Sequence, residues 1–297
     1  ISGKLNQCEG DIFMDVYEKQ LEEEIPDFEE HIPEKHGAFD ISATVSSVKI
    51  RGWKQVAGIL AVAIVILGGL ELLIRIFQVP EFVFPAPSAT FRALVTSFPN
   101  NYIHFLITLS ELISGYVVGA SIGLILAAVL TQVPYLEKVI TPYILLLICT
   151  PTLALVPLLM LKLGFNIWPR IIAVSLASGP MVMINSVTGF RRTDLAKIAL
   201  AKSYGASTFQ IFKKIRFPLA LPMIIVGLLV GGIFGLITAV GSDMVGGKIG
   251  LGNKISYYSS LARMAHFFAI IIMVAVIGIS IWIIFSRVGK KWASWTE

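Results

Sequence analysis

Six apolar stretches, each about as long as a bilayer crossing, dominate this chain of 297 residues. A helix needs about 20 mostly apolar residues to span the hydrocarbon core of a membrane. The composition agrees with this pattern, because 56% of the residues are hydrophobic and only 14% are charged. We therefore predict an all-α polytopic membrane protein with six transmembrane helices. The predicted spans are Val56–Phe77, Tyr102–Thr131, Val139–Leu161, Trp168–Phe190, Leu219–Val240 and Ala265–Ser286. A short amphipathic piece, Ser88–Phe98, is expected to lie along the membrane interface.

Lysine and arginine gather on one side of these spans, with 14 residues in the loops and ends on that side and 5 on the other. Cytoplasmic loops of membrane proteins carry such an excess of positive charge. Both termini and the loop at 191–216 are therefore predicted to face the cytoplasm. The basic charge belongs to loops beside the membrane, so it is weak support for nucleic-acid binding.

The N-terminal part of the chain differs in charge from the rest. Residues 1–54 hold 12 acids against 6 bases. We predict an acidic cytoplasmic extension over 1–50, followed by a transmembrane domain over 51–297. Residues 1–13 precede Met14, the first methionine, and are expected to be either a non-native segment or a processed remnant. A solvated tail with one amphipathic helix (Val16–Ile25) is the favoured interpretation, and a regulatory or docking segment is the alternative.

A polar interruption, Arg191–Pro218, separates the fourth and fifth predicted spans. It contains seven lysine or arginine residues and one acid. The pattern predicts a short helix from Asp194 to Tyr204 that ends at Gly205, and a second helical piece that stops before Pro218. A polar helix held between two spans requires a partner against which it can dock. We therefore expect a partner protein on this side of the membrane.

Three acids lie within or beside the spans, where a charge facing lipid would be costly. Glu71 is expected to pair with Arg75, one turn further along the same helix. A structural role is favoured for Glu111 over a place in a transport pathway. For Asp243, which precedes a glycine-rich turn, a pathway or gating role and a structural role are equally supported.

Prolines and glycines mark two further features. The prolines at 142, 151 and 157 predict a break in the third span, and irregular backbone at membrane depth is tolerated where it is buried in protein or lines a wet cavity. Gly115, Gly119 and Gly123 favour close helix packing within one subunit over a dimer interface. The candidate pathway residues are Thr150, Pro151, Pro157, Asn185, Ser242, Asp243 and Met244.

Motifs for catalysis and metal binding are missing from the sequence. Two cysteines and four histidines show neither disulfide nor metal-ligand spacing. The nearest candidate for a phosphate-binding loop, at Gly247-Lys248, has Ser242 where the first glycine should be and Ile249 after the lysine. We predict no catalytic residue, no metal and no cofactor in this chain. Any ATP hydrolysis would belong to another chain.

The chain resembles the membrane subunit of a binding-protein-dependent ABC importer, in the branch that handles nitrate, taurine and alkanesulfonates. The cytoplasmic signature of this family is E-A-A, three residues, G, nine residues and I-x-L-P. Ala199-Leu200-Ala201 occupies the first three places, Gly205 that of the glycine and Ile215-Arg216-Phe217-Pro218 the end, with the spacing intact. Ala199 replaces the glutamate, Leu200 the first alanine and Phe217 the leucine. Other matches are Phe84–Ser88, the proline-rich third span, the approach to the signature from Asn185, Asp243-Met244 and Gly250-Leu251-Gly252.

The resemblance implies a type I ABC importer permease fold in a bacterial cytoplasmic (inner) membrane. It makes the helix near 194–205 the coupling helix, which in the family sits in a cleft of the ATPase. The implied coupling residues are Asp194, Ala199, Leu200, Ala201, Lys202, Tyr204, Gly205 and Ala206. The implied partners are two ABC ATPase subunits that bind ATP and Mg, an extracytoplasmic substrate-binding protein and a second permease copy. A small anion such as nitrate or a sulfonate is the expected solute.

Two other functions remain open at this stage. An ion-coupled secondary transporter would show an inverted repeat and ionisable residues at the membrane midplane. A membrane scaffold or sensor without transport would use the acidic extension as its interaction arm. Solute-dependent ATPase activity in a partner chain would separate the importer from both.

Overall fold

The computed structural model describes residues 53–193, 195–246 and 248–292. Helices, and no strands, occur in these ranges. The predicted N-terminal extension, including Val16–Ile25, and Asp194 lie outside the described residues. The helices in chain order are α3 (Trp53–Ile76), α4 (Pro87–Leu130), α5 (Pro134–Cys149), α6 (Thr152–Leu163), α7 (Trp168–Arg191), α8 (Leu195–Ser203), α9 (Thr208–Ile211), the π-helix η1 (Phe212–Arg216), α10 (Phe217–Gly246), α11 (Leu251–Ser260) and α12 (Met264–Trp292).

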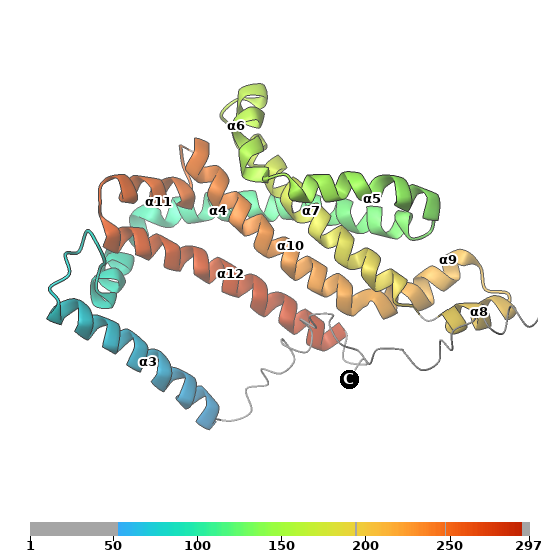
Figure 1. Cartoon of the computed structure of the whole chain (residues 1–297), viewed down its shortest axis with the longest axis horizontal. Helices are drawn as coiled ribbons and strands as arrows, with labels where there is room; N and C mark the ends of the chain where they lie inside the picture. The colour runs from blue at the N-terminus through green and yellow to red at the C-terminus, as the bar shows by residue number, and fades with distance from the viewer. Residues whose placement is uncertain (1–52, 194, 247, 293–297) are drawn as a thin grey trace, which may run out of the picture. The chain divides into compact units, whose positions relative to one another are not determined.

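The predicted spans agree with the helices of the described chain (Figure 1). Five helices are long and apolar enough to cross a membrane, and α5 with α6 would make a sixth, broken span. These two helices meet at an angle of 90° across Thr150-Pro151. The break predicted from the prolines therefore falls at Pro151. Pro142 and Pro157 lie inside α5 and α6 without ending them.

The interfacial piece predicted at Ser88–Phe98 is not a separate helix. It forms the first turns of α4, which runs without interruption to Leu130 and contains Pro99. Figure 1 shows these first turns pointing in a different direction from the rest of α4. A proline within a helix removes one backbone hydrogen bond and commonly bends the helix. Pro99 therefore accounts for a bend here instead of the expected gap.

The second helical piece after Gly205 also differs from the prediction, which ended it before Pro218. Helical structure continues from Thr208 through η1 into α10, as far as Gly246. In the π turn η1, the amide of Phe217 donates a hydrogen bond to the carbonyl of Phe212, five residues earlier. This turn directly precedes Pro218, which has no amide hydrogen to donate. A single π turn is a known way to absorb such an irregularity without ending a helix.

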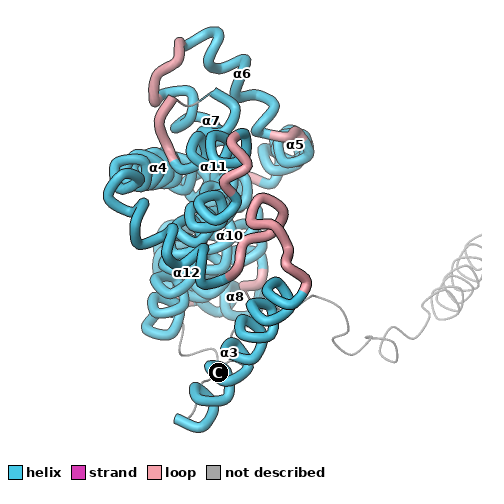
Figure 2. The backbone as a smooth tube through the Cα atoms, turned by 90° about the vertical axis from the view of Figure 1, so that its left-hand side faces the viewer, coloured by secondary structure: helices cyan, strands magenta, loops and turns pink. Residues whose placement is uncertain are grey.

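Helix α7 lies at the centre of the membrane-spanning helices. It packs along α4 and along α10, and α12 packs against α10 and α4 (Figures 1 and 2). Val174 of α7 belongs to one buried core cluster with Leu112 and Leu236, and Met183 belongs to another with Leu130. By contrast, α3 has its main contact with α4. The α5–α6 pair packs against α7, and α6 also contacts α10.

Close approach of α4 to α7 depends on the glycines of α4. A Cβ atom on Gly115 would lie 2.6 Å from the Cβ of Val174. A Cβ on Gly119 would overlap the backbone of Ser175, and one on Gly123 would overlap the backbone of Gly179. The prediction of packing within one subunit is therefore confirmed for this glycine series.

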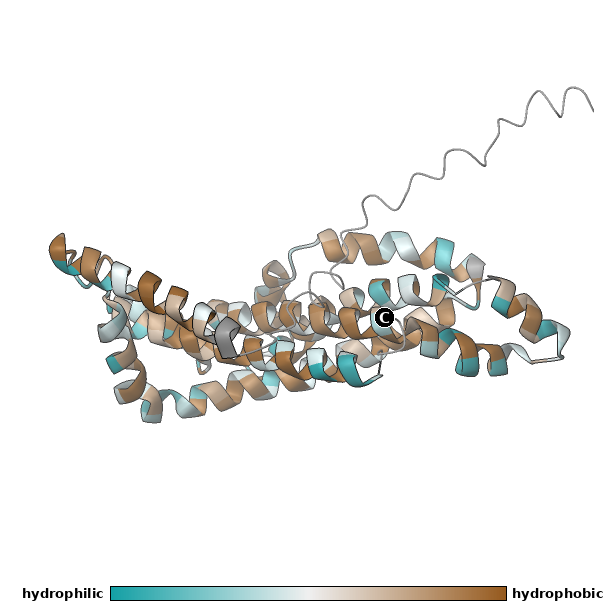
Figure 3. Cartoon of the chain, turned by 90° about the horizontal axis from the view of Figure 1, so that it is seen from below, coloured by the Kyte–Doolittle hydropathy of each residue, from teal (hydrophilic) through white to brown (hydrophobic). Residues whose placement is uncertain are grey.

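Hydrophobic residues make up most of the length of the long helices, and hydrophilic residues are more frequent at the helix ends and loops (Figure 3). On α3, Ile64 is 70% exposed and Val65 is 72% exposed. Large apolar side chains with this exposure cannot face water around a whole helix, so α3 must face lipid or another protein chain. This distribution is the one expected for a protein that spans a membrane.

Candidate functional site

The short helix α8 presents an apolar and basic surface on the side predicted to be cytoplasmic. Only Ile198 of this surface region is buried, whereas Leu200 is 60% exposed and Tyr204 is 84% exposed. Lys197 and Lys202 are exposed beside them. Exposed aromatic side chains such as that of Tyr204 are enriched at protein interfaces.

The end of α8 agrees with the sequence prediction. Gly205 has φ of +80°, a conformation that side chains with a Cβ rarely adopt, and it ends the helix that began at Leu195. The amide of Gly205 donates to the Lys202 carbonyl, and the amide of Ala206 donates to the Ala201 carbonyl. These two bonds satisfy carbonyls at the helix end. The glycine is therefore required for the turn that presents α8.

Among the predicted coupling residues, Ala199, Leu200, Lys202, Tyr204 and Gly205 are exposed, and Ala201 and Ala206 are partly buried. Asp194, as noted, is not described. The structure therefore brings seven of the eight residues together on one exposed segment. Their role in coupling remains a prediction.

Three aromatic rings hold the two ends of the α8 region together. Phe190 lies at the end of α7, and Phe212 and Phe217 lie where the chain returns toward α10. The ring centroids of Phe190 and Phe212 are 5.2 Å apart, and those of Phe190 and Phe217 are 6.4 Å apart. Aromatic pairs at these separations contribute attraction beyond the burial of area. These ring contacts join the end of α7 to the start of α10 beside the α8 region.

Two polar contacts link this region to the turn between α4 and α5. Arg191 forms an ion pair with Glu137 at the start of α5. Arg216 donates to the carbonyl of Thr131 at the end of α4, with an N–O distance of 3.3 Å. The α8 region is thus connected to four long helices, namely α4, α5, α7 and α10.

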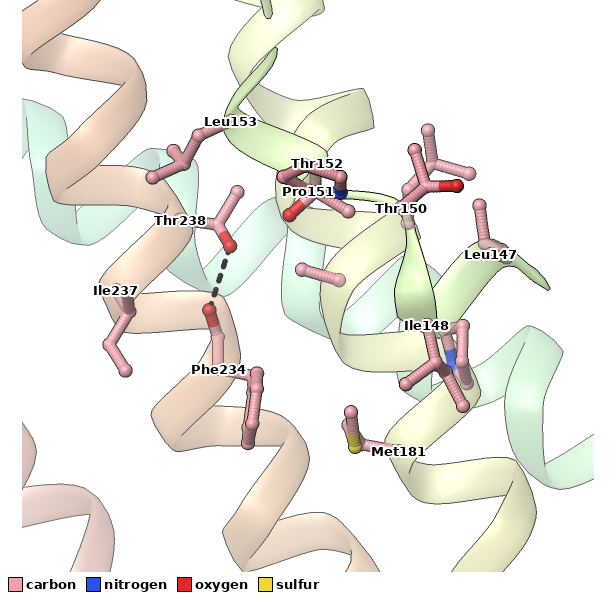
Figure 4. Close-up of a pocket in the computed structure, with 13 residues that line it drawn as sticks. Leu147, Ile148, Thr150, Pro151, Thr152, Leu153, Met181, Phe234, Ile237 and Thr238 are labelled. Carbon is pink, nitrogen blue, oxygen red and sulfur yellow. Dashed lines mark hydrogen bonds between the residues drawn. The ribbon is translucent and has the colours of Figure 1, made fainter. Parts of the chain in front are cut away.

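A cavity of about 230 Å³ lies at the break between α5 and α6 (Figure 4). Its other walls come from α7, with Ala177 and Pro180, and from α10, with Phe234 and Thr238. The predicted pathway residues Thr150 and Pro151 line this cavity. Their side chains lie at the bend that connects the two helices of the broken span.

The other predicted pathway residues lie away from the cavity. Pro157 is exposed on α6, and Met244 is 46% exposed on α10. Asn185 donates to the Met181 carbonyl of its own helix, at 2.8 Å. Ser242 is fully buried and donates to the Ala239 carbonyl, also at 2.8 Å. A pathway role for these residues stays a prediction.

Asp243 belongs to a buried cluster of charges. Its carboxylate is fully buried, and Arg170 of α7 donates to it at 2.8 Å. The same guanidinium nitrogen lies 2.6 Å from the carboxylate of Glu111 on α4. A single positive charge on Arg170 therefore pairs with two acids from different helices. This pairing explains how Glu111 and Asp243 are accommodated inside the protein.

Hydrogen bonds extend the cluster to the turn before α11. Thr108 donates to Asp243 at 2.7 Å and accepts from the amide of Leu251 at 2.8 Å. Nδ1 of His104 accepts from the amide of Gly250 at 3.0 Å. Gly250, with φ of +135°, lies so close to Asp243 that a Cβ there would overlap the carboxylate. The cluster therefore fixes the glycine-rich turn against α4 and α7.

Sequence reasoning missed Arg170, which joins the two acids. An available signal was the position of Arg170 near the start of an apolar span, because a cation inside a span needs an acidic partner. Glu71 was assigned its correct partner. Arg75 lies 2.6 Å from Glu71, and the same carboxylate also accepts from the amide of Ser88 at 3.0 Å.

The described chain is a helical bundle with several apolar helices long enough to span a membrane, a broken span beside a cavity and a short exposed helix between two spans, which is the architecture of a polytopic membrane protein. The chain belongs to the family of binding-protein-dependent transport system inner membrane components, whose sequence profile matches residues 119–294. It is therefore an ABC importer permease subunit. Known relatives support this assignment.

An ABC transporter permease protein from Haemophilus influenzae is 28% identical over 68% of this chain and 83% of its own length. A Bacillus subtilis protein named SsuC, for aliphatic sulfonates transport, is 27% identical over 76% of this chain and 82% of its own. Related permeases are also named for other solutes, including riboflavin.

The crystal structure of an amino acid ABC transporter with histidines has a similar fold, with a TM-score of 0.53 and 20% sequence identity. The similarity covers 67% of this chain and 94% of the other. The type I importer fold implied by the sequence is thereby supported.

Proposed function

We propose that this chain carries a small solute, delivered by an extracytoplasmic binding protein, across the inner membrane with energy from separate ATPase subunits. The expected solute is a small anion such as nitrate or a sulfonate. Two copies of the chain would form the pathway, with both termini and α8 in the cytoplasm. ATP and Mg would bind to the ATPase subunits.

The observation that carries this proposal is the exposed face of α8, with Leu200 and Tyr204 at its centre. Apolar side chains with this exposure on a helix outside the spans favour a protein partner. The surrounding lysines favour a partner surface with acidic groups. A helix of 9 residues is too short to be stable alone in water, so α8 depends on its contacts. Its connection to α7 and α10 would convert movement of a docked ATPase into movement of the spans.

A direct test compares the proteins that co-purify with the full-length chain in mild detergent. Leu200→Glu and Tyr204→Glu alter exposed side chains and should leave the fold intact. Phe165→Glu, at a residue that is 67% exposed between α6 and α7, is the matched control. We expect a P-loop ATPase with the wild type and the control, and at least about tenfold less with either α8 variant, as for loss of an interface hot spot. Equal recovery with all four proteins would contradict the proposal.

A further inference from the structure

The charges of the buried cluster between α4, α7 and α10 do not balance, because two acids share one guanidinium. The side chains of Glu111 and Asp243 are fully buried, and that of Arg170 is 11% exposed. If both acids were ionised, one negative charge would be left over inside the protein. An uncompensated buried charge is so costly that the group takes up a proton and becomes neutral instead.

No other cation within the described residues forms an ion pair with either acid. Nδ1 of His104 accepts a hydrogen bond from a backbone amide, so its imidazole is not in the doubly protonated, cationic form. Lys254 of α11 places its ammonium 5.4 Å from the centroid of the Tyr257 ring. The ring of His266, from α12, lies 5.1 Å from that of Tyr258. The leftover charge must therefore be removed at the carboxyl groups themselves.

The oxygens of the two acids leave a place for a proton and not for a metal ion. Oδ1 of Asp243 accepts from Arg170, and Oδ2 accepts from Thr108. Oε1 of Glu111 contacts Arg170, whereas its Oε2 is buried and receives no hydrogen bond from the described residues. A hard cation such as Ca²⁺ takes about six or more oxygen ligands. In the described ranges, no group of three or more acidic, histidine or cysteine side chains could hold a metal ion.

The carboxyl groups of Glu111 and Asp243 also lie within hydrogen-bonding reach of each other. An ionised carboxylate can only accept hydrogen bonds, so this contact becomes a hydrogen bond when one of the two groups is protonated. Two carboxyl groups at such close range cannot both ionise readily, and they hold one proton between them. We infer that Glu111 and Asp243 form a proton-binding site, in which they share one proton and Arg170 balances the remaining negative charge.

The shared proton holds the turn that leads into α11. Asp243 accepts from Thr108, and the hydroxyl of Thr108 accepts from the amide of Leu251 at the start of α11. Loss of the proton places two negative charges side by side, and their repulsion pushes Asp243 away from this arrangement. A rise in pH therefore loosens the turn. The site lies at the opposite end of α10 from α8, so it is separate from the proposed ATPase contact.

The first test is infrared spectroscopy of the purified full-length protein at neutral pH, because a protonated carboxyl group has a C=O stretching band that a carboxylate lacks. Wild type is compared with Glu111→Gln, Asp243→Asn and the control Glu71→Gln. Each replacement within the pair leaves one acid for one arginine, so the proton is no longer needed and the band should be lost. Glu71 has its own partner in Arg75, so the control should keep the band of the wild type.

The second test is thermal unfolding of the same proteins from about pH 6 to about pH 8, where exposed carboxyl groups are ionised throughout. The folded wild type holds one proton more than its unfolded chain. Its ratio of folded to unfolded protein should therefore fall about tenfold per pH unit relative to Glu111→Gln.

A carboxyl band that is absent from the wild type, or that both variants of the pair retain, would overturn the proton site. The same conclusion would follow if wild type and Glu111→Gln lost stability equally as the pH rose. A band that survives in Asp243→Asn alone would show that Glu111 holds the proton without Asp243 and would overturn the sharing. If one variant failed to fold, the other would still decide, because each should lose the band.

Discussion

The rings of Phe190 and Phe212 lie with their centroids 5.2 Å apart, so the helix that enters the α8 region touches the helix that leaves it. Phe190 is 2% exposed, and Phe212 is partly buried. The contact joins the two ends of the exposed segment that carries Leu200 and Tyr204. The two ends of this segment are therefore held together by direct contact between α7 and η1.

Replacement of Phe212 by alanine is expected to weaken this contact between the two ends of the segment. An aromatic pair contributes about 0.5–1.5 kcal/mol, so local opening of α8 should become about twofold to tenfold more frequent. Hydrogen–deuterium exchange of the amides at 195–203 measures that opening. The control is Phe91→Ala, at a 66% exposed position of α4. Exchange in α8 that is unchanged by Phe212→Ala would show that the rings do not hold the segment.

Arg170→Met should destabilise the protein severely. It leaves Glu111 and Asp243 buried without a cation, and removal of one partner from a buried ion pair costs about 3–5 kcal/mol. Thermal inactivation in detergent measures the loss. Addition of Glu111→Gln and Asp243→Asn to the same variant should restore much of the stability, because the buried charges are then gone.

The matched control for this prediction is Arg75→Met. Arg75 pairs with Glu71, but its side chain is 69% exposed, and exposed pairs contribute about 0–1 kcal/mol. If the variants at 75 and 170 proved equally stable, the buried cluster would not have the structural role described for it.

Much of the fold could be predicted because bilayer crossing imposes a length and an apolar composition on each span. The starts of α7 and α12 fall within one residue of the predicted spans. Less could be predicted where proline interrupts a helix. The pieces predicted to end at Phe98 and before Pro218 both continue as helix through the following proline, whereas Pro151 does break its span. The difference depends on packing and on the π turn before Pro218, which local sequence does not encode.

The candidate sites likewise differ in how far they could be predicted from the sequence. The α8 surface could be predicted because its residues are close in sequence and their spacing is intact. The charge cluster could not, since Glu111, Arg170 and Asp243 come from three helices and meet only after packing. The cavity likewise combines the predicted Thr150 and Pro151 with residues of α7 and α10, most of which, such as Ala177 and Phe234, carry no polar signal in sequence.

Gly115→Leu should also be destabilising, because α7 leaves no space for a side chain at this position. The Cβ alone would lie 2.6 Å from the Cβ of Val174, and overpacking of a filled core costs about 1–3 kcal/mol. The yield of monodisperse protein in detergent measures the effect. Gly68→Leu is the control, since no heavy atom lies within 4 Å of a Cβ built there. A larger loss for Gly68→Leu would contradict the described packing of α4 on α7.

Glu71 ties α3 to the start of α4 through Ser88. The Ser88 hydroxyl donates to it at 2.8 Å and the Ser88 amide at 3.0 Å. Glu71→Leu removes both bonds, each of which contributes about 1 kcal/mol. We expect proteolysis of the connection at 77–86 to become about thirtyfold faster, because a loss of about 2 kcal/mol favours local opening by that factor. Glu81→Leu, at an exposed residue of the same connection, should have little effect. Equal rates of proteolysis in both variants would show that Glu71 does not hold α3 to the start of α4.

The most direct test of the central claim is photo-crosslinking from α8 in intact membranes. A benzophenone amino acid is placed at Tyr204 or, as a control, at Phe165, and crosslinked partners are identified by mass spectrometry. We predict a P-loop ATPase attached at 204 and none at 165. No ATPase at 204, or equal attachment at both positions, would contradict the assignment of α8 as the site where a separate ATPase drives this permease.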